Sequence, residues 1–216
     1  MTNKECCPLC KNRDTSLFAK GENRVYLHCK NCDLVYVPKE YFVSTEDEKA
    51  NYDKHQNSPQ NKGYVEFLNK LLIPLRENLS QDAKGLDFGS GPGPTLSVIM
   101  QELGYEMEIY DYFYHDDKKV FEKSYDFITT TEVIEHLHNP LDEIKKLWNC
   151  LELGGSLGIM TAFRPDLDIF KSWYYKRDLT HVRFFTKKTF EWLKDELSAE
   201  LFIPQSDVVI LKKEKI

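Results

Sequence analysis

The sequence of 216 residues contains no apolar run close to the roughly 20 residues that a membrane-spanning helix needs. Its first residues, MTNKECCPLCKNRD, lack the apolar core of a secretory signal peptide. A positive excess is also missing, because 29 lysines and arginines against 35 acidic residues give a formal net charge of −6. We therefore expect a soluble, cytoplasmic protein that has no membrane partner and does not favour tight nonspecific binding of nucleic acid.

Repeats and low-complexity tracts are absent as well. Hydrophobic residues make up 41% of the chain and aromatic residues 13%, so a core can be buried and general disorder is not expected. The length allows one sizeable α/β domain together with a small appendage.

The cysteines are unevenly spread. Four of the six form two C-x-x-C pairs, and in a cytosolic protein this pattern indicates a metal site more than disulfides. Thiolates of Cys7, Cys10, Cys29 and Cys32 would give tetrahedral Zn²⁺ a closed, structural site. Cys6 would also reach such an ion, but Cys7 makes the two pairs symmetric. The sequence therefore predicts a zinc-ribbon-like module over residues 1–40.

A polar segment over residues 41–62 is interpreted as a linker, which Tyr41, Phe42 and Tyr52 could dock onto the main domain or onto a ligand. Hydrophobic periodicity then predicts strands alternating with helices. Helices are expected over 64–75, 94–103, 140–151 and 186–197, and strands over 85–89, 107–111, 125–131, 155–162, 199–203 and 206–212. This order predicts a parallel sheet with helices on both faces and a final antiparallel pair.

The stretch LDFGSGPGPTLS, residues 86–97, places glycines between a strand and a helix. Such a turn lets the backbone approach a ligand closely, and the helix that follows offers free N–H groups. The dinucleotide fingerprint G-x-G-x-x-G is broken because Pro94 takes its third glycine position, which makes an NAD-linked oxidoreductase the least favoured function. A P-loop is excluded because the turn has no lysine followed by serine or threonine.

The motif from Asp87 to Gly93, D-x-G-x-G-x-G, resembles motif I of the class I S-adenosylmethionine (SAM) dependent methyltransferases. IYD, YDFITTTEVIEHLHNP, LWNCLELGGSLGIMT and DLTHVRFFTKKTF resemble later segments of that family, in the same order. The resemblance covers residues 63–216 and implies a methyltransferase domain of Rossmann-like, doubly wound α/β fold. Its mostly parallel sheet would carry an antiparallel C-terminal strand, beside the small N-terminal zinc ribbon.

The resemblance also implies which residues hold SAM. Asp111, at the tip of the second strand, would accept hydrogen bonds from the ribose hydroxyls, and Asp87 would help to position the amino end. The family normally fits a helix and a strand between Asp111 and Tyr125, but here the segment is short, with 118–121 as a residual strand. Tyr112 and Phe113 could then pack against adenine. The predicted cofactor-binding residues are Asp87, Gly89, Ser90, Gly91, Gly93, Asp111, Tyr112 and Glu132.

Methyl transfer to oxygen or carbon needs a base, and His136 and His181 are the candidates because imidazole titrates near neutral pH. Asp178 lies three residues before His181 and could orient it. The aromatic stretch 173–175 would form a wall of the acceptor site or pack on the core. Nearby basic residues hint at an acceptor that carries a carboxylate or phosphate: Arg164, Lys176, Arg177 and Arg183.

A second metal site is an alternative. In a helical turn Glu132, Glu135 and His136 would share one face, and with His181 they resemble the metal site of small-RNA 3′-terminal 2′-O-methyltransferases. The plainer interpretation is that these residues stabilise the turn or line the cleft.

The favoured function is SAM-dependent methyl transfer to a small-molecule or carrier-bound acceptor. One alternative is an RNA methyltransferase, with or without the second metal. The other is a catalytically silent binding module whose cleft is blocked by residues 112–114. The ribbon resembles those of deoxysugar C-methyltransferases and of ribosomal-RNA guanine methyltransferases, where it helps to hold substrate. The sequence leaves the oligomeric state open.

Overall fold

The computed structural model describes residues 6–54 and 57–214. Its larger sheet has six strands in the order β5-β4-β6-β7-β10-β9. Strands β5, β4, β6 and β7 run parallel, and β10 is antiparallel to both of its neighbours. This arrangement confirms the predicted fold. The strands are β4 (Lys84–Phe88), β5 (Glu106–Tyr110), β6 (Tyr125–Thr131), β7 (Leu151–Met160), β9 (Ala199–Gln205) and β10 (Val208–Lys213).

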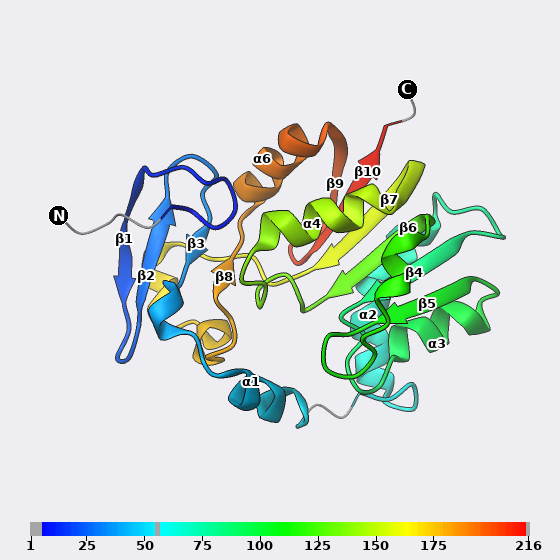
Figure 1. The fold of residues 1–216 in the computed structure, drawn as a ribbon, viewed down its shortest axis with the longest axis horizontal. Helices are drawn as coiled ribbons and strands as arrows, with labels where there is room; N and C mark the ends of the chain where they lie inside the picture. Colours follow the sequence, from blue (N-terminus) through cyan, green and yellow to red (C-terminus); the bar gives the residue numbers. More distant parts are fainter. Residues whose placement is uncertain (1–5, 55–56, 215–216) are drawn as a thin grey trace.

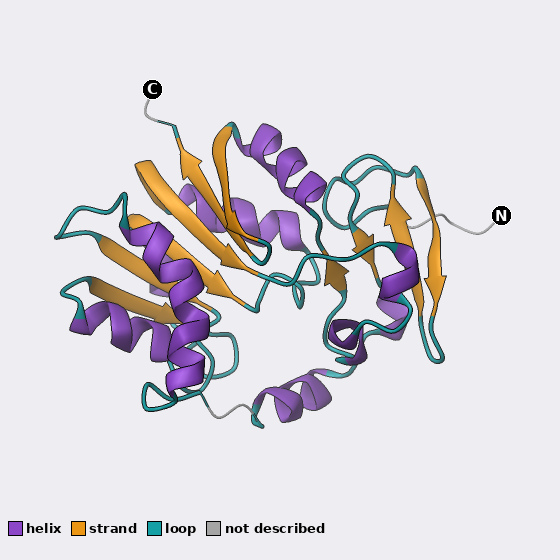
Figure 2. Cartoon of the chain, turned by 180° about the vertical axis from the view of Figure 1, so that it is seen from behind, coloured by secondary structure: helices purple, strands orange, loops and turns teal. Residues whose placement is uncertain are grey.

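Helices cover both faces of this sheet (Figures 1 and 2). On one face α2 (Lys62–Arg76) and α3 (Thr95–Glu102) share a core with Phe127 of β6. On the other, α4 (Pro140–Asn149) and α6 (Lys187–Leu197) share a core with Ile128, because successive strand residues point to opposite faces. None of the helices in the described part of the chain is long and apolar enough to cross a membrane.

Local signals explain where several helices begin. The apolar residues of α2 recur at helical spacing, and Leu68, Leu71, Leu72 and Leu75 are buried. Helix α6 begins after Thr186, the predicted N-cap, whose hydroxyl accepts a hydrogen bond from the backbone N–H of Thr189 in a capping box.

The smaller sheet joins the N-terminal strands to a later segment of the chain. It contains β1 (Thr15–Lys20), β2 (Val25–Cys29), β3 (Val35–Tyr36) and β8 (Arg183–Phe184), in that order. Because β3 pairs with β8, the cysteine-bearing strands continue into the segment just before α6 (Figure 1). The division into residues 1–40, 41–62 and 63–216 stays a prediction.

Two predicted elements differ from the structure. Residues 118–121 do not form a strand but lie in the 3₁₀ helix η2 (Lys118–Glu122), which begins after Asp117 with a hydrogen bond from Lys119 N–H to the Asp117 side chain. Only residues 111–124 separate β5 from β6, which is too short for a helix and a further parallel strand. Strand β7 also begins four residues earlier than predicted, because the glycine pair forms an irregularity inside the strand, where Gly154 has φ +83°.

The short elements lie in the segments that join the sheets. Residues 45–52 of the predicted linker form helix α1 (Thr45–Tyr52), capped by the Ser44 side chain. The remaining elements are η1 (Lys39–Tyr41), α5 (Leu167–Phe170) and η3 (Tyr174–Arg177).

Candidate cofactor and acceptor site

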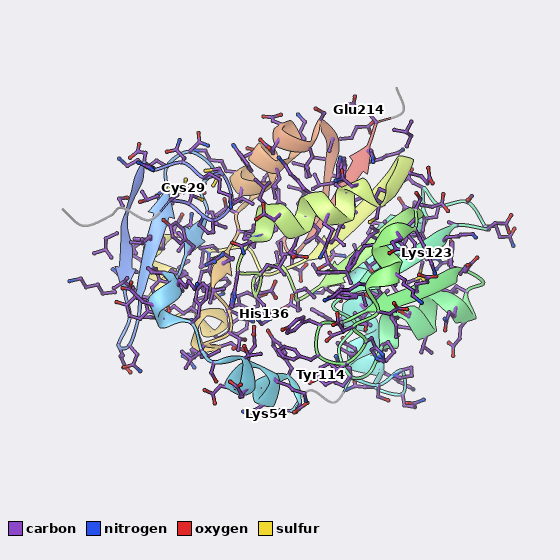
Figure 3. The ribbon with its side chains drawn as sticks, viewed as in Figure 1. Cys29, Lys54, Tyr114, Lys123, His136 and Glu214 are labelled. Carbon is purple, nitrogen blue, oxygen red and sulfur yellow. The ribbon has the colours of Figure 1, made fainter. Side chains whose placement is uncertain are left out.

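A cavity of about 800 Å³ lies at the carboxyl ends of β4, β5 and β6. Its volume is within the roughly 300–1,000 Å³ that is usual for ligand pockets. Every predicted cofactor-binding and catalytic residue lines it, and Figure 3 labels His136 among them. These residues are Asp87, Gly89, Ser90, Gly91, Gly93, Asp111, Tyr112, Glu132, His136, Asp178 and His181.

The glycine turn has a conformation that side chains would disturb. Gly89 and Gly91 have φ +80° and +65°, in the left-handed region. A Cβ at Gly89 would lie 2.3 Å from Cγ2 of Val133, and one at Gly93 would lie 2.5 Å from the carbonyl oxygen of Asn57. The backbone N–H of Gly89 donates to the Tyr110 carbonyl at 2.8 Å, which attaches the turn to the end of β5.

Asp111 fastens the same turn from its other side. One carboxylate oxygen accepts from the Gly91 N–H at 2.9 Å, and the other accepts from the N–H groups of Phe113 and Tyr114 at 2.8 and 3.2 Å. A carboxylate offers about four lone-pair positions, so these bonds leave capacity for a ligand hydroxyl.

Asp87 lies beneath the turn and is only 3% exposed. Its two oxygens accept hydrogen bonds from the hydroxyls of Thr129 at 2.9 Å and Ser97 at 3.3 Å. Burial raises the pKa of Asp87 to about 6, and these two hydrogen bonds limit the rise.

Residues 112–114 line the cavity and do not block it. Tyr112 is 64% exposed, and its ring contacts Phe113 edge to face with centroids 4.9 Å apart. The cavity is also lined by Phe88, Tyr110 and Lys146. The Lys146 ammonium group lies over the rings of Phe88 and Tyr110. The structure therefore does not support the blocked cleft of the binding-module alternative.

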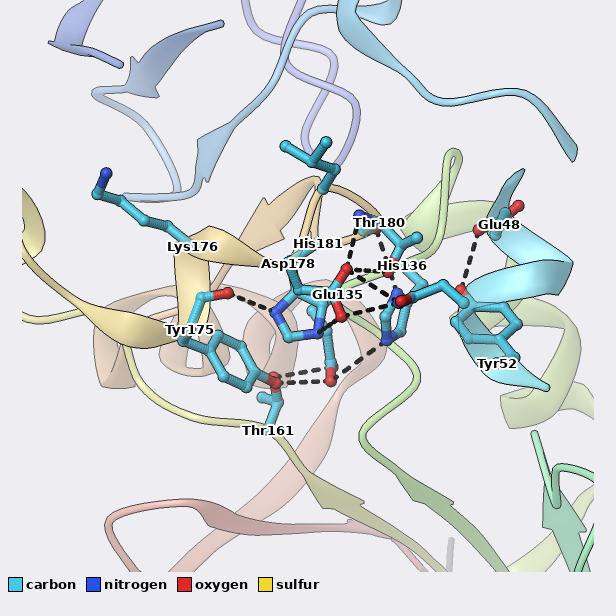
Figure 4. Close-up of polar contacts among 12 residues, drawn as sticks. Glu48, Tyr52, Glu135, His136, Thr161, Tyr175, Lys176, Asp178, Thr180 and His181 are labelled. Carbon is cyan, nitrogen blue, oxygen red and sulfur yellow. Dashed lines mark hydrogen bonds and ion pairs between the residues drawn. The ribbon is translucent and has the colours of Figure 1, made fainter. Parts of the chain in front are cut away.

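The two histidines of the cavity lining contact each other, with ring centroids 4.6 Å apart (Figure 4). Nδ1 of His136 lies 3.2 Å from the Thr180 carbonyl, and Nδ1 of His181 lies 2.8 Å from the Tyr175 carbonyl. Because a carbonyl only accepts, each Nδ1 carries the proton and each neutral ring has its basic lone pair on Nε2.

Glu135 lies behind this pair and has no exposed surface. Its carboxyl group accepts hydrogen bonds from the hydroxyls of Tyr175 at 2.6 Å and Thr161 at 2.9 Å. Burial raises its pKa well above the usual range, and the charge of Glu132 raises it further. Nε2 of His136 lies 3.9 Å from the carboxyl group.

Three of the four residues of the alternative metal site come together. The ligand atoms of Glu135, His136 and His181 all lie within 4.8 Å of one another, and Glu132 does not belong to this group. Residues 132–136 are not helical, and Glu132 has φ +54°. Burial raises the pKa of Glu132 to about 7, with the charge of Asp207 raising it further and that of Lys70 lowering it. The prediction that Glu132, Glu135 and His136 share one face of a helical turn is therefore wrong.

The family described as methyltransferase domain matches residues 54–197, which include the glycine turn, Asp111 and both histidines. The chain belongs to this methyltransferase family. No curated protein matches the sequence.

Solved structures share the fold of this methyltransferase at low identity. A SAM-dependent methyltransferase from Methanosarcina mazei is 13% identical, with a TM-score of 0.50, and the match covers 66% of this chain and 98% of that one. An O-methyltransferase family protein from Burkholderia thailandensis is 10% identical, with a TM-score of 0.51 over 78% and 63% of the two chains. A chain from a complex between a methyltransferase activator and a methyltransferase of Haloferax volcanii is 8% identical, with a TM-score of 0.51 over 77% and 97%.

Sequence reasoning missed the part that α1 plays in the methyltransferase's cavity. Glu48 and Tyr52 line it, and the Tyr52 ring contacts His136 edge to face with centroids 5.2 Å apart. Asn51 donates to both carboxylate oxygens of Asp178 at 3.1 and 3.3 Å. The sequence of α1 has no amphipathic pattern, and none of its residues is buried. The aromatic Tyr52 was the only signal in it for a contact with the main domain or a ligand.

The basic residues after β7 do not line the cavity. The Arg164 guanidinium pairs with Asp33 at 3.2 Å, and Arg183 donates to the carbonyls of Val37, Val182 and His138. Charged side chains of the lining are mainly acidic, which leaves the predicted carboxylate or phosphate acceptor without support. They are Glu48, Asp87, Asp111, Glu132, Glu143 and Asp178, against Lys146.

The aromatic stretch 173–175 is divided between the cavity and an apolar cluster. Tyr174 is 67% exposed and lines the cavity together with Tyr175. Trp173 instead packs against Phe170 and Phe184 in the apolar cluster of the smaller sheet.

The four predicted cysteine ligands form one cluster beside the smaller sheet. All four sulfurs lie within 4.8 Å of one another, with 3.6 Å between Cys7 and Cys32 and 3.3 Å between Cys10 and Cys29. Tetrahedral Zn²⁺ with bonds of about 2.3 Å requires S···S distances of about 3.8 Å, which this cluster approaches.

The two knuckles have the same backbone geometry. Lys11 and Asp33, which follow the second cysteine of each pair, have φ +57° and +63°. Each donates its N–H to the carbonyl of the first cysteine, Cys7 or Cys29. Cys6 is exposed and lies outside the cluster, so the geometry supports the choice of Cys7.

Proposed function

We propose that this chain transfers a methyl group from SAM to a small-molecule or carrier-bound acceptor. The observation that carries the proposal is the single cavity that the glycine turn and Asp111 line together with His136 and His181. We call the part beside the two histidines its acceptor end. When bound, SAM supplies a methyl group that its sulfonium sulfur already activates, so positioning of the acceptor provides most of the catalysis.

The chain's own residues suit both ends of this reaction. Asp111, which already fastens the turn, would hold the ribose hydroxyls, and the glycine turn with Asp87 beneath it would accommodate the methionine part of the cofactor. An acidic lining favours a cationic cofactor. At the acceptor end, Nε2 of His136 or His181 takes the proton of the nucleophile, and the Asp178 carboxylate, 3.9 Å from Nε2 of His181, stabilises the imidazolium that this ring then becomes.

The acceptor that we propose is not RNA. A phosphate backbone needs lysine and arginine at its contact surface, whereas the cavity offers six carboxylates and one lysine. Helix α1 also contributes to the wall of the acceptor end through Thr45, Glu48 and Tyr52, which favours a compact acceptor group. For the four-cysteine cluster we propose a structural zinc ion.

Thermal unfolding with S-adenosylhomocysteine tests this function. We expect the melting temperature to rise by roughly 5–10 °C at about 100 times the Kd, because binding then stabilises the folded chain by about 2.7 kcal/mol. NADH is the control and leaves the melting temperature unchanged. No rise in folded, zinc-loaded protein would favour the binding module. A rise that needs added Mg²⁺ or Mn²⁺ would favour a metal at Glu135, His136 and His181.

The affinity for SAM should depend on the protonation of Asp87. With its pKa raised to about 6, Asp87 stays neutral to higher pH in the folded chain than in the unfolded chain. Its contribution to the free energy of unfolding therefore falls as the pH rises from about 4 to 6. Cationic SAM favours the ionised form. We therefore expect the Kd for SAM to tighten by up to about tenfold from pH 5 to pH 7.5.

Isothermal titration calorimetry at pH 5.0, 6.0 and 7.5 measures this dependence. The Asp87→Asn variant is the matched control, because it keeps the shape of the side chain and cannot ionise. The histidines titrate in both proteins. The difference between the two proteins in how the Kd for SAM changes with pH is therefore the contribution of Asp87. Equal slopes for the two proteins would contradict the prediction.

A further inference from the structure

Arg24 directly precedes a strand of the cysteine-bearing sheet, yet its side chain reaches the backbone of the segment that carries Asp178 and His181. It precedes β2 and is 5% exposed. Its Nη1 group donates to the carbonyls of Leu179 and His181 at 3.0 and 3.1 Å. Its Nη2 group donates to the carbonyls of Lys176 and Asp178 at 2.6 and 2.9 Å.

The remaining donor of Arg24, Nε, bonds the hydroxyl of Tyr26 at 3.0 Å. A guanidinium has five N–H donors in a fixed planar arrangement, and here five acceptors face them. Four of these acceptors are carbonyls of residues 176–181, the end of η3 and the irregular loop that follows it. A shorter or more flexible cation would not satisfy this set, because lysine has three donors and no fixed plane.

The loop that Arg24 holds carries the proposed catalytic groups. It contains Asp178 and His181, and its Thr180 carbonyl accepts from Nδ1 of His136. Irregular backbone in a partly buried loop needs donors for its carbonyls, since unpaired buried carbonyls are costly. Both histidine rings are therefore linked to a side chain more than 100 residues away in the sequence.

A second attachment joins the ribbon to the same half of the chain. Asp33 directly follows the knuckle residue Cys32, and its carboxylate accepts from the Thr186 hydroxyl at 2.7 Å and the Arg164 guanidinium at 3.2 Å. Strand β3, which follows Asp33, also pairs with β8, which precedes Thr186. The cysteine-bearing sheet thus contacts the segment 164–186 at its knuckle, along its edge and at Arg24.

We propose that the ribbon positions the acceptor end of the active site, and that Arg24 is the positioning residue through which it does so. This inference rests on the proposed function. It assigns the ribbon a task different from direct contact with substrate: the ribbon holds the loop that places Asp178, His181 and, through Thr180, His136. Cofactor binding, at the other end of the cavity, does not depend on Arg24.

Three readouts on the full-length, zinc-loaded chain test the proposal. In Arg24→Ala we expect amide hydrogen exchange over residues 176–182 to be at least about tenfold faster, since four backbone acceptors lose their donor. The ¹⁵N spectrum of the His181 ring should change from a single Nδ1–H tautomer to a mixture. The Kd for S-adenosylhomocysteine, measured by calorimetry, should stay within about threefold of the parent value.

Two further variants make the result decisive. Arg13→Ala removes an exposed arginine of the same module and should change none of the readouts. Arg24→Lys keeps the charge and should remain folded even if Arg24→Ala does not, while its loop still exchanges faster and its tautomers still mix.

Unchanged exchange and an unchanged His181 tautomer in a folded Arg24 variant would overturn the proposal. So would a loss of S-adenosylhomocysteine affinity of more than about tenfold, because the effect would then not be confined to the acceptor end. Failure of the parent chain to bind this ligand would instead contradict the proposed function. Exchange and tautomer readouts stay interpretable in that case, since neither requires turnover.

Discussion

Replacing Cys32 with serine is expected to abolish zinc binding and to lower the melting temperature by more than about 10 °C. Cys32 is fully buried, and its sulfur lies 3.6 Å from that of Cys7. Structural zinc contributes about 10–16 kcal/mol in small zinc-binding peptides, and part of that free energy is folding free energy here. Elemental analysis gives the zinc content per chain, and calorimetry gives the melting temperature.

Cys6→Ser is the matched control for this substitution, because Cys6 is exposed and adjoins a ligand without belonging to the cluster. We expect it to retain one zinc per chain and to melt within about 2 °C of the parent. A Cys32→Ser variant that still holds one zinc ion would contradict the assignment of the ligands. Loss of zinc from Cys6→Ser would show that Cys6, and not Cys7, completes the site.

The Gly89→Ala substitution is expected to weaken S-adenosylhomocysteine binding by at least about 100-fold. Gly89 has φ +80°, and the new methyl group would lie 2.3 Å from Cγ2 and 2.9 Å from Cγ1 of Val133. The turn must therefore move, and its hydrogen bond to the Tyr110 carbonyl is lost with it. Because Gly91 N–H bonds Asp111, the displacement reaches the proposed ribose site. Calorimetry measures the Kd.

Gly104→Ala separates this effect from backbone strain. Gly104 has φ +95°, follows α3 outside the cavity, and a Cβ there would meet no atom within 4 Å. Both substitutions place alanine in the left-handed region, at a cost of about 1–2 kcal/mol of stability. We expect Gly104→Ala to bind S-adenosylhomocysteine like the parent. Parent-like binding by Gly89→Ala, or an equal loss in the two variants, would refute the prediction.

Elements with a local signal could be predicted from the sequence. Alternation and helical periodicity placed the six strands of the large sheet and the helices on its faces, because each of these elements buries one side against a core. The glycines around Gly91 indicated a ligand turn, and the spacing of the cysteines indicated their cluster. In each case the information lies within a dozen residues, or in a spacing that metal geometry demands.

Contacts between distant segments could not be predicted in this way. Strands β3 and β8 have two residues each, which is too short for a periodic pattern, and their pairing depends on how the sheets are placed. Helix α1 buries no residue, so apart from the aromatic Tyr52 its composition was that of a linker. The left-handed conformation of Glu132 removed it from the group that its spacing predicted.

The sequence alone therefore determined the fold of this chain, the position of its glycine turn and the residues of its cysteine cluster. Only the tertiary structure decided that Arg24 holds the loop of His181, and that the basic residues after β7 face away from the cavity. The physical reason is that a side chain's charge and donors are local properties. Its partners, by contrast, depend on which backbone carbonyls and carboxylates the whole fold brings to it.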